Sequence, residues 1–202
     1  MKDPERTHTR RRFLGVSVAG PAALVLAPSL ARAQTRTRPP TPACGEASAP
    51  TPHQTAGPYF KPESPRRASL LEPGMPGTRI VVEGTVVRTD CTPVPRALVD
   101  VWHADAGGDY DNDGYRCRGH LFTDDAGRYR LETIVPGIYP GRTRHFHVRV
   151  QAPGERVLTT QLYFPEEPLN GRDGIFSPDL VMRVRDADGR KTAAFDFVLG
   201  KG

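Results

Sequence analysis

Short runs of β-branched and aromatic residues, each ended by Gly, Pro or Asp, recur from residue 79 onward and limit the possible folds more than any other feature. Such enrichment is typical of β-strands. No segment shows the 3.6-residue apolar period of an amphipathic helix. Short strands at this spacing predict an all-β fold, an antiparallel sandwich or barrel with long loops. The expected strands are 80–87, 97–103, 128–134, 145–150, 157–163 and 193–198.

The chain of 202 residues divides into three segments. Residues 34–78 are rich in Pro, Thr, Ser and Arg and lack a periodic apolar pattern, so we expect an extended arm. Residues 79–202 carry the strands and are long enough for one domain with an ordinary core. Within the arm, Tyr59 and Phe60 follow a turn and either close over a pocket or simply pin the arm to the core.

Residues 1–33 have the pattern of a twin-arginine signal peptide. Arg10, Arg11 and Arg12 precede an apolar run, 16–30, that ends in Ala-Arg-Ala, which predicts cleavage after Ala33. A membrane anchor is the weaker alternative, because the run contains Gly and Pro and is shorter than the roughly 20 residues needed to span a bilayer. We therefore expect the twin-arginine export machinery as a partner, a periplasmic or extracellular location, and no stable membrane insertion after cleavage.

The net charge of +5 comes largely from this leader. Six of the 28 basic residues and two of the 23 acidic residues lie in it, which leaves 22 basic and 21 acidic residues in the rest of the chain. A nearly neutral domain gives no electrostatic reason to expect a nucleic-acid partner. Export also exposes three cysteines to an oxidising compartment. We expect Cys44 to pair with Cys91, since both lie beside Pro-rich turns, and Cys117 to be buried and free.

Residues 142–150, Arg-Thr-Arg-His-Phe-His-Val-Arg-Val, form a strand candidate with two alternating histidines. Successive side chains of a strand point to opposite faces, so His145 and His147 project from one face and can serve one metal ion. Tyr139 lies just upstream in a Pro/Gly-rich turn, which can bring its phenol oxygen to the imidazoles. Two histidines on a strand are also common as ordinary surface or core residues, so the metal site depends on the rest of the pattern.

Several further motifs follow one another in a fixed order between residues 51 and 164. They are Val82–Val86, Val99–Asp105, Gly108–Tyr110, Pro136–Pro140, Arg142 with His145–His147, and Thr160–Phe164. Together they resemble the intradiol ring-cleavage dioxygenases, the family of catechol and protocatechuate dioxygenases, in its exported single-domain form. The resemblance implies an enzyme that uses O2 to cleave a small aromatic 1,2-diol between its hydroxyl-bearing carbons, giving a cis,cis-muconate-type diacid.

The resemblance also implies a non-haem Fe(III) cofactor. Its ligands are implied to be Tyr110, Tyr139, His145 and His147. Fe(III) is a hard cation and phenolate a hard anionic donor, and the cation lowers the phenol pKa from its usual value near 10. By the same resemblance, Tyr139 leaves the metal and accepts a substrate proton when the diol binds.

Two further residues acquire roles from the resemblance. Arg142 is implied to stabilise charge that develops on the ring, and Gln161 to line the pocket for O2 and substrate. Their alternative roles are a surface ion pair for Arg142 and a strand-end hydrogen bond for Gln161. Two other classes of protein stay open: an exported non-catalytic β-sandwich that binds a diol or an ion, and a copper or zinc site that uses only the two histidines.

Overall fold

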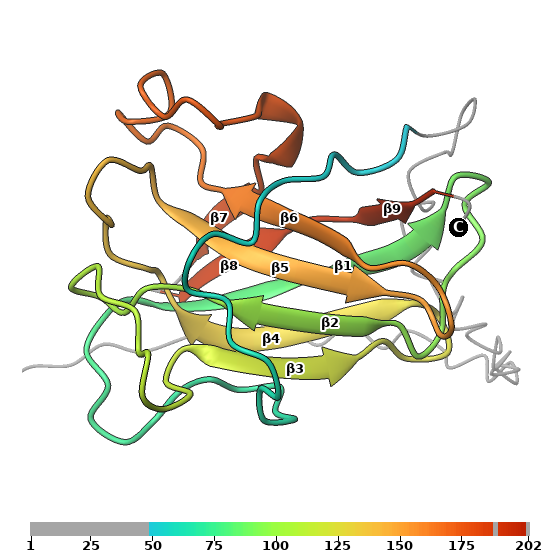
Figure 1. The fold of residues 1–202 in the computed structure, drawn as a ribbon, viewed down its shortest axis with the longest axis horizontal. Coiled ribbons are helices and arrows are strands. Elements are labelled where there is room, and N and C mark those ends of the chain that lie inside the picture. The colour runs from blue at the N-terminus through green and yellow to red at the C-terminus, as the bar shows by residue number, and fades with distance from the viewer. Residues whose placement is uncertain (1–48, 188–189, 201–202) are drawn as a thin grey trace, which may run out of the picture. The chain divides into compact units, whose positions relative to one another are not determined.

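Nine strands and one 3-10 helix make up the regular structure of residues 49–187 and 190–200, the part of the chain that the computed structural model describes. The expected all-β class is confirmed (Figure 1). The strands are β1 Arg79–Arg88, β2 Leu98–Trp102, β3 Arg118–Phe122, β4 Arg128–Ile134, β5 His145–Gln151, β6 Leu158–Tyr163, β7 Arg183–Ala187, β8 Arg190–Ala194 and β9 Phe197–Leu199, with the helix η1 Pro178–Leu180 between β6 and β7. The proposed leader lies outside the described residues.

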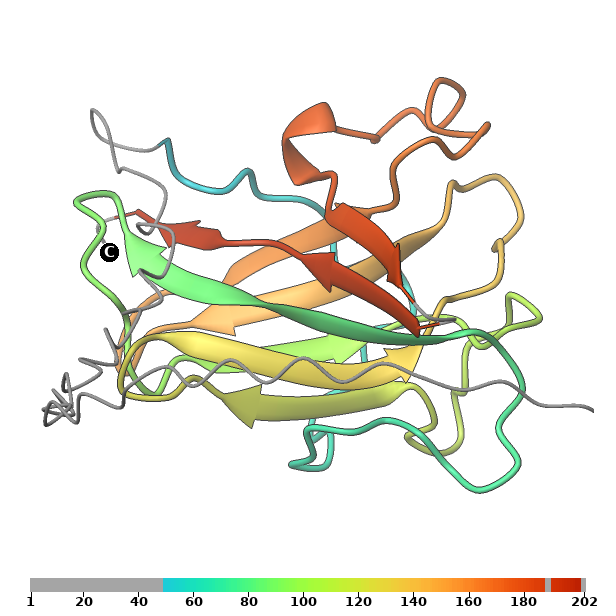
Figure 2. The ribbon, with the colours of Figure 1, turned by 180° about the vertical axis from the view of Figure 1, so that it is seen from behind.

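Two sheets stack face to face. One has the strand order β3-β2-β5-β6, and the other has the order β4-β1-β8-β7 with β9 also paired to β1. The expected antiparallel sandwich is confirmed for most strand pairs and corrected for two, because β1 runs parallel to β8 and to β9. Figure 2 shows this second sheet from behind, with β8 and β9 following β1 along successive parts of its length.

Three strand predictions need correction. The strands β3 and β7 were not expected, because their charged and glycine residues leave no clear alternation of apolar and polar side chains in the sequence. In the structure they pair with β2 and β8, respectively. The expected strand 193–198 is split between β8 and β9. At the break, the Phe195 N–H donates to the Glu83 carbonyl. The Thr85 N–H donates to the Asp196 carboxylate at 2.9 Å, in place of a backbone carbonyl of a neighbouring strand.

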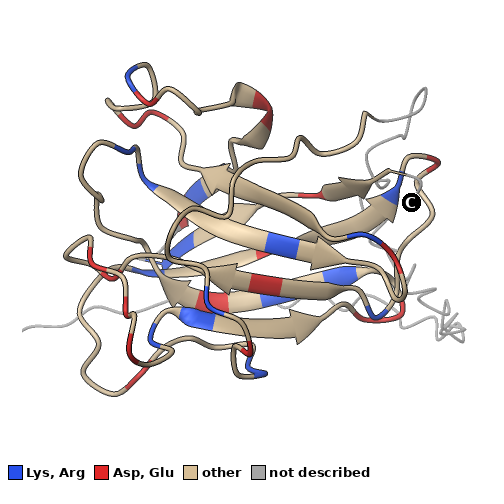
Figure 3. Ribbon diagram, in the orientation of Figure 1, with Lys and Arg blue, Asp and Glu red and all other residues tan. Residues whose placement is uncertain are grey.

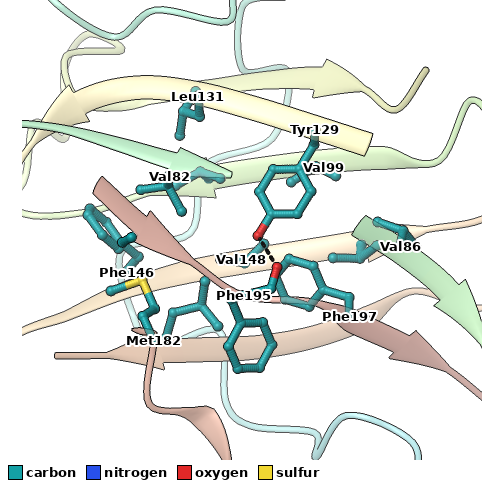
Figure 4. Close-up of a cluster of buried hydrophobic side chains, with 14 of the residues drawn as sticks. Val82, Val86, Val99, Tyr129, Leu131, Phe146, Val148, Met182, Phe195 and Phe197 are labelled. Atoms are coloured by element: carbon teal, nitrogen blue, oxygen red, sulfur yellow. Dashed lines mark hydrogen bonds between the residues drawn. The ribbon is translucent and has the colours of Figure 1, made fainter. Parts of the chain in front are cut away.

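Alternate residues of each strand fill the core between the sheets. From β5, Phe146, Val148 and Val150 are almost completely buried there. Figure 4 shows Phe146 and Val148 among side chains from the opposite sheet, where the Tyr129 hydroxyl donates to the Phe195 carbonyl at 2.8 Å. Burial of one such apolar side chain stabilises the fold by about 1.5–3 kcal/mol. The strict alternation of β5 therefore fixes its register and turns its histidines away from the core.

Residues 49–60, part of the arm, cover the outer face of the sheet β3-β2-β5-β6. Residues 49–60 contain no strand and pass in front of this sheet in Figure 1. Backbone hydrogen bonds join Gln54 N to the Thr159 carbonyl at 2.8 Å and Thr51 N to the Val198 carbonyl at 2.9 Å. Further along the arm, Leu70 is 0% exposed and belongs to the core. The arm is thus the layer under which the histidines lie.

Cys91 is disulfide-bonded, while Cys117 is free and buried as expected. Cys44, the expected partner of Cys91, lies outside the described residues. Basic and acidic residues are interspersed along the strands and loops (Figure 3). Among residues 49–187 and 190–200, no helix has the length and apolar character required to cross a bilayer.

Candidate functional site

A row of three side chains across the covered sheet forms the floor of the site. Trp102 of β2 pairs with His147 of β5, which pairs with Gln161 of β6. Directly paired residues of adjacent strands place their side chains on the same face. His147 is 2% exposed and stacks on the Trp102 ring at a centroid distance of 5.0 Å and an interplanar angle of 4°. The neighbouring row pairs His145 with Tyr163.

The two histidines converge as their alternation predicts. His145 Nε2 lies 3.2 Å from His147 Nε2. His145 Nδ1 lies 2.6 Å from the Thr143 carbonyl, so this nitrogen carries the proton and Nε2 presents a lone pair. Burial lowers the pKa of His145 to about 4 and the pKa of His147 well below its usual value. Both imidazoles are therefore neutral at pH 7, the form in which histidine binds metals.

Tyr110 and Tyr139 come from two loops that meet backbone to backbone. The Gly137 N–H donates to the Asp105 carbonyl at 2.7 Å. A side chain on Gly137 would lie 2.3 Å from Gly108 N, and one on Gly108 would lie 2.4 Å from the Ile138 carbonyl oxygen, so the contact requires both glycines. This packing brings the two tyrosine rings within 5.8 Å of each other and places the Tyr110 hydroxyl 3.5 Å from His145 Nε2.

Tyr59, from the arm, also contacts the two tyrosines of the site. Its hydroxyl is hydrogen-bonded to the Tyr139 hydroxyl at 2.7 Å, and its ring stacks on Tyr110 at 4.5 Å. The hydrogen bond to Tyr139 is the main reason that the pKa of Tyr59 is raised. Phe60, in contrast, packs edge-on against Trp102 and fixes the arm.

Arg142 and Gln161 are bonded to each other. Arg142 Nη2 donates to Gln161 Oε1 at 2.7 Å, and Arg142 Nε donates to Asp173 Oδ2 at 2.8 Å. Gln161 Nε2 donates to the Thr55 carbonyl of the arm at 3.0 Å. The ion pair of Arg142 is partly buried, since Asp173 is 8% exposed, and the hydrogen-bonded Gln161 is 0% exposed.

The donor set fits a hard cation. Two imidazole nitrogens bound to one ion at about 2.1 Å, at a right angle, lie about 3 Å apart, which agrees with the 3.2 Å between the two Nε2 atoms. Burial raises the pKa of Tyr110, so its phenol ionises only beside a strong positive charge. Within the described residues, no group of three or more His, Cys, Asp or Glu side chains could hold a metal ion. The donors that converge here are two imidazoles and the Tyr110 phenol.

Sequence reasoning missed part of the site. Asp173, in the loop after β6, was not singled out, and Tyr163 was given no role in the site, although its hydroxyl donates to Gln54 Oε1 at 2.7 Å and lies 3.2 Å from Gln161 Oε1. The only local signal for Tyr163 was its place in the motif Thr160–Phe164. The contacts of His103 and His120 are structural, since His103 Nε2 bonds Thr133 Oγ1 and His120 Nδ1 bonds Ser64 Oγ.

Comparison with known families and curated proteins gives consistent results. A family profile described as "Dioxygenase" matches residues 55–201. Hydroxyquinol 1,2-dioxygenase of Nocardioides simplex is 35% identical over 144 residues, which cover 59% of this chain and 49% of that protein. Catechol 1,2-dioxygenase of Candida albicans is 29% identical over 66% of this chain and 54% of its own length. The chain therefore spans about half the length of these curated relatives.

Solved structures match over a larger share of their length. One is the dioxygenase domain of a dioxygenase carbohydrate-binding protein fusion from Streptomyces sp. SirexAA-E, which is 53% identical with a TM-score of 0.74. The match covers 76% of this chain and all of that domain. The 3-chlorocatechol 1,2-dioxygenase of Rhodococcus opacus 1CP is 30% identical with a TM-score of 0.70, and the match covers 75% of this chain and 73% of that one.

Proposed function

Because the chain belongs to the intradiol ring-cleavage dioxygenase family, we propose that it uses O2 to cleave a small aromatic 1,2-diol between its hydroxyl-bearing carbons. Both atoms of O2 enter the product, a cis,cis-muconate-type diacid. The observation that carries this proposal is the convergence of two neutral imidazoles with phenol side chains under the arm, with His145 Nε2 3.2 Å from His147 Nε2 and 3.5 Å from the Tyr110 hydroxyl.

The proposed cofactor is Fe(III), held by Tyr110, Tyr139, His145 and His147. When bound, Fe(III) supplies a Lewis acid that favours the diolate form of the substrate and its reaction with O2. The Thr143 carbonyl orients His145 by accepting a hydrogen bond from its Nδ1–H, and Trp102 holds the His147 ring by stacking. The arm excludes water from this face, since His145 and His147 are only 5% and 2% exposed.

Tyr139 is the proposed base. A diol must lose its phenolic protons to bind as a dianion, and Tyr139 Oη can accept one of them. The Tyr59 hydroxyl, 2.7 Å away, can hold the protonated phenol through a hydrogen bond. We expect Tyr139→Phe to keep iron but bind catechol poorly at neutral pH, whereas Tyr110→Phe weakens iron binding itself. Equal behaviour of the two variants in iron content and catechol titration would contradict this division of roles.

Arg142 is proposed to stabilise negative charge that develops on the ring, and Gln161 to line the pocket beside it. The hydrogen bond of 2.7 Å between them supports a joint position next to the histidine row. Removal of one preorganised charge of this kind costs about 100-fold in rate. Arg142→Ala should therefore lose most turnover and keep its iron, as measured by metal analysis and oxygen uptake.

The proposed site of action is outside the cytoplasm. The twin-arginine pattern of residues 1–33 supports export. The disulfide at Cys91 agrees with an oxidising compartment.

Colour and oxygen uptake test the proposed function together. Tyrosinate bound to Fe(III) absorbs visible light, so iron-loaded protein should be red to burgundy, and catechol should be consumed with one equivalent of O2. A colourless protein that binds zinc, or a protein that binds copper, through His145 and His147 alone would contradict the proposed metal centre. A coloured protein that binds catechol without oxygen uptake would instead be the non-catalytic binding module.

A further inference from the structure

Asp173 places a buried carboxylate directly behind Arg142. Its side chain is 2% exposed, whereas that of Arg142 is 21% exposed. Asp173 Oδ2 accepts from Arg142 Nε at 2.8 Å and from the Thr143 N–H at 2.9 Å, while Oδ1 accepts from the Ile175 N–H at 3.1 Å. The carboxylate therefore joins the loop after β6 to the segment that leads into His145.

Asp173 remains ionised in this position. Burial by itself would raise the pKa of the carboxyl group, but the N–H donors of Thr143 and Ile175 and the Arg142 side chain outweigh burial and lower that pKa. An ionised acceptor forms shorter and stronger hydrogen bonds with a guanidinium than a neutral one does. Arg142 thus has a permanent anionic partner on its Nε side.

The other side of the guanidinium is fixed by Gln161. The Gln161 amide can adopt only one orientation, because its Nε2 donates to the Thr55 carbonyl at 3.0 Å and its Oε1 accepts from Arg142 Nη2 at 2.7 Å. Nε and Nη2 of Arg142 are thus both occupied. The Tyr163 hydroxyl also interacts with the Arg142 side chain, so the guanidinium is held by residues from both sides.

We propose that Asp173 is a positioning residue, which holds the Arg142 guanidinium in one fixed orientation beside the ring-cleavage site. An arginine side chain has several rotatable bonds, and a charge accelerates a reaction only when it is held in place before the charge on the substrate develops. The kinetic part of this inference rests on the proposed function, whereas the fixed orientation of Arg142 does not.

The first experiment measures that orientation without iron or turnover. The Arg142 Nε–H signal of metal-free protein, labelled with 15N and assigned by its loss in Arg142→Lys, should exchange slowly with water. In Asp173→Asn the exchange should become at least about 10-fold faster, because the anionic acceptor is lost. Asp179→Asn is the matched control, since Asp179 is an exposed carboxylate of η1, between β6 and β7, that forms no ion pair with a described residue.

The second experiment is a double-mutant cycle on iron-loaded protein with catechol. Asp173→Asn should lower kcat by roughly 10- to 100-fold and change KM by less than about 3-fold. In an Arg142→Ala background the same substitution should lower kcat by less than about 2-fold, because Asp173 acts through Arg142. Asp179→Asn should leave kcat unchanged in both backgrounds.

Two results would overturn the inference: an Arg142 Nε–H that exchanges as fast in the wild type as in an unfolded arginine peptide, or equal losses of kcat in the two backgrounds. The first result requires no Asp173 variant, so it can overturn the inference even if Asp173→Asn does not fold. If wild-type protein cleaves no diol, the proposed function fails, and the exchange measurement alone still supports or refutes the fixed Arg142.

Discussion

Replacing Gly57 by alanine tests whether the arm sets the position of His147. Gly57 has φ +67°, and an added methyl carbon would lie 3.2 Å from Cε1 and 3.5 Å from Nε2 of His147. His147 has little room to retreat, because it is 2% exposed and stacks on Trp102. The substitution therefore combines backbone strain with a forced shift of a proposed metal ligand.

Gly74 separates these two effects. It has φ +73°, and a methyl carbon added there meets no atom within 4 Å. A left-handed conformation costs a non-glycine residue about 1–2 kcal/mol, so Gly74→Ala should lose about that much stability. Gly57→Ala should lose about 1 kcal/mol more, since overpacking of a tight site adds to the strain.

Urea unfolding followed through Trp102, the single tryptophan, measures both stabilities. Iron affinity, measured by competition with a chelator, should fall about 10-fold in Gly57→Ala, as is typical when support of a metal ligand is disturbed. It should not change in Gly74→Ala. If the two variants lose equal stability and both keep the wild-type iron affinity, contact with the arm does not position His147.

Other predictions concern pH, the disulfide and the leader. Burial lowers the pKa of His103 to about 4 from 6.5, so the unfolded chain binds more protons between these values. The contribution of His103 to stability should therefore decrease by about 3 kcal/mol as the pH falls from 6.5 to 4, and urea titrations of His103→Gln should show a flatter pH dependence. Peptide mapping without reduction should link Cys44 to Cys91, a bridge that stabilises by roughly 3–4 kcal/mol, whereas a link to Cys117 would contradict it. Mass spectrometry of exported protein should find a new N-terminus directly after Ala33, and an intact leader would refute the cleavage site.

Local patterns in the sequence determined the fold class and the core of the site. A strand alternates its side chains whatever its neighbours are, so the pattern of residues 145–150 was sufficient to place His145 and His147 together on one face and Phe146 and Val148 in the core. Most strands were predictable for the same reason. The motif resemblance added Tyr110 and Tyr139, whose loops do meet.

Only the tertiary structure decided which distant residues complete the site. Tyr59 and Tyr139 are 80 positions apart, and Gln54 and Tyr163 are 109 apart, so no local period could connect them. Asp173 lies in a loop without alternation, and its role follows from where that loop folds back against Arg142. The parallel pairing of β1 likewise depends on strands more than 100 residues away. Side-chain periodicity determines local conformation and the buried face, whereas contacts between loops depend on the packed chain as a whole.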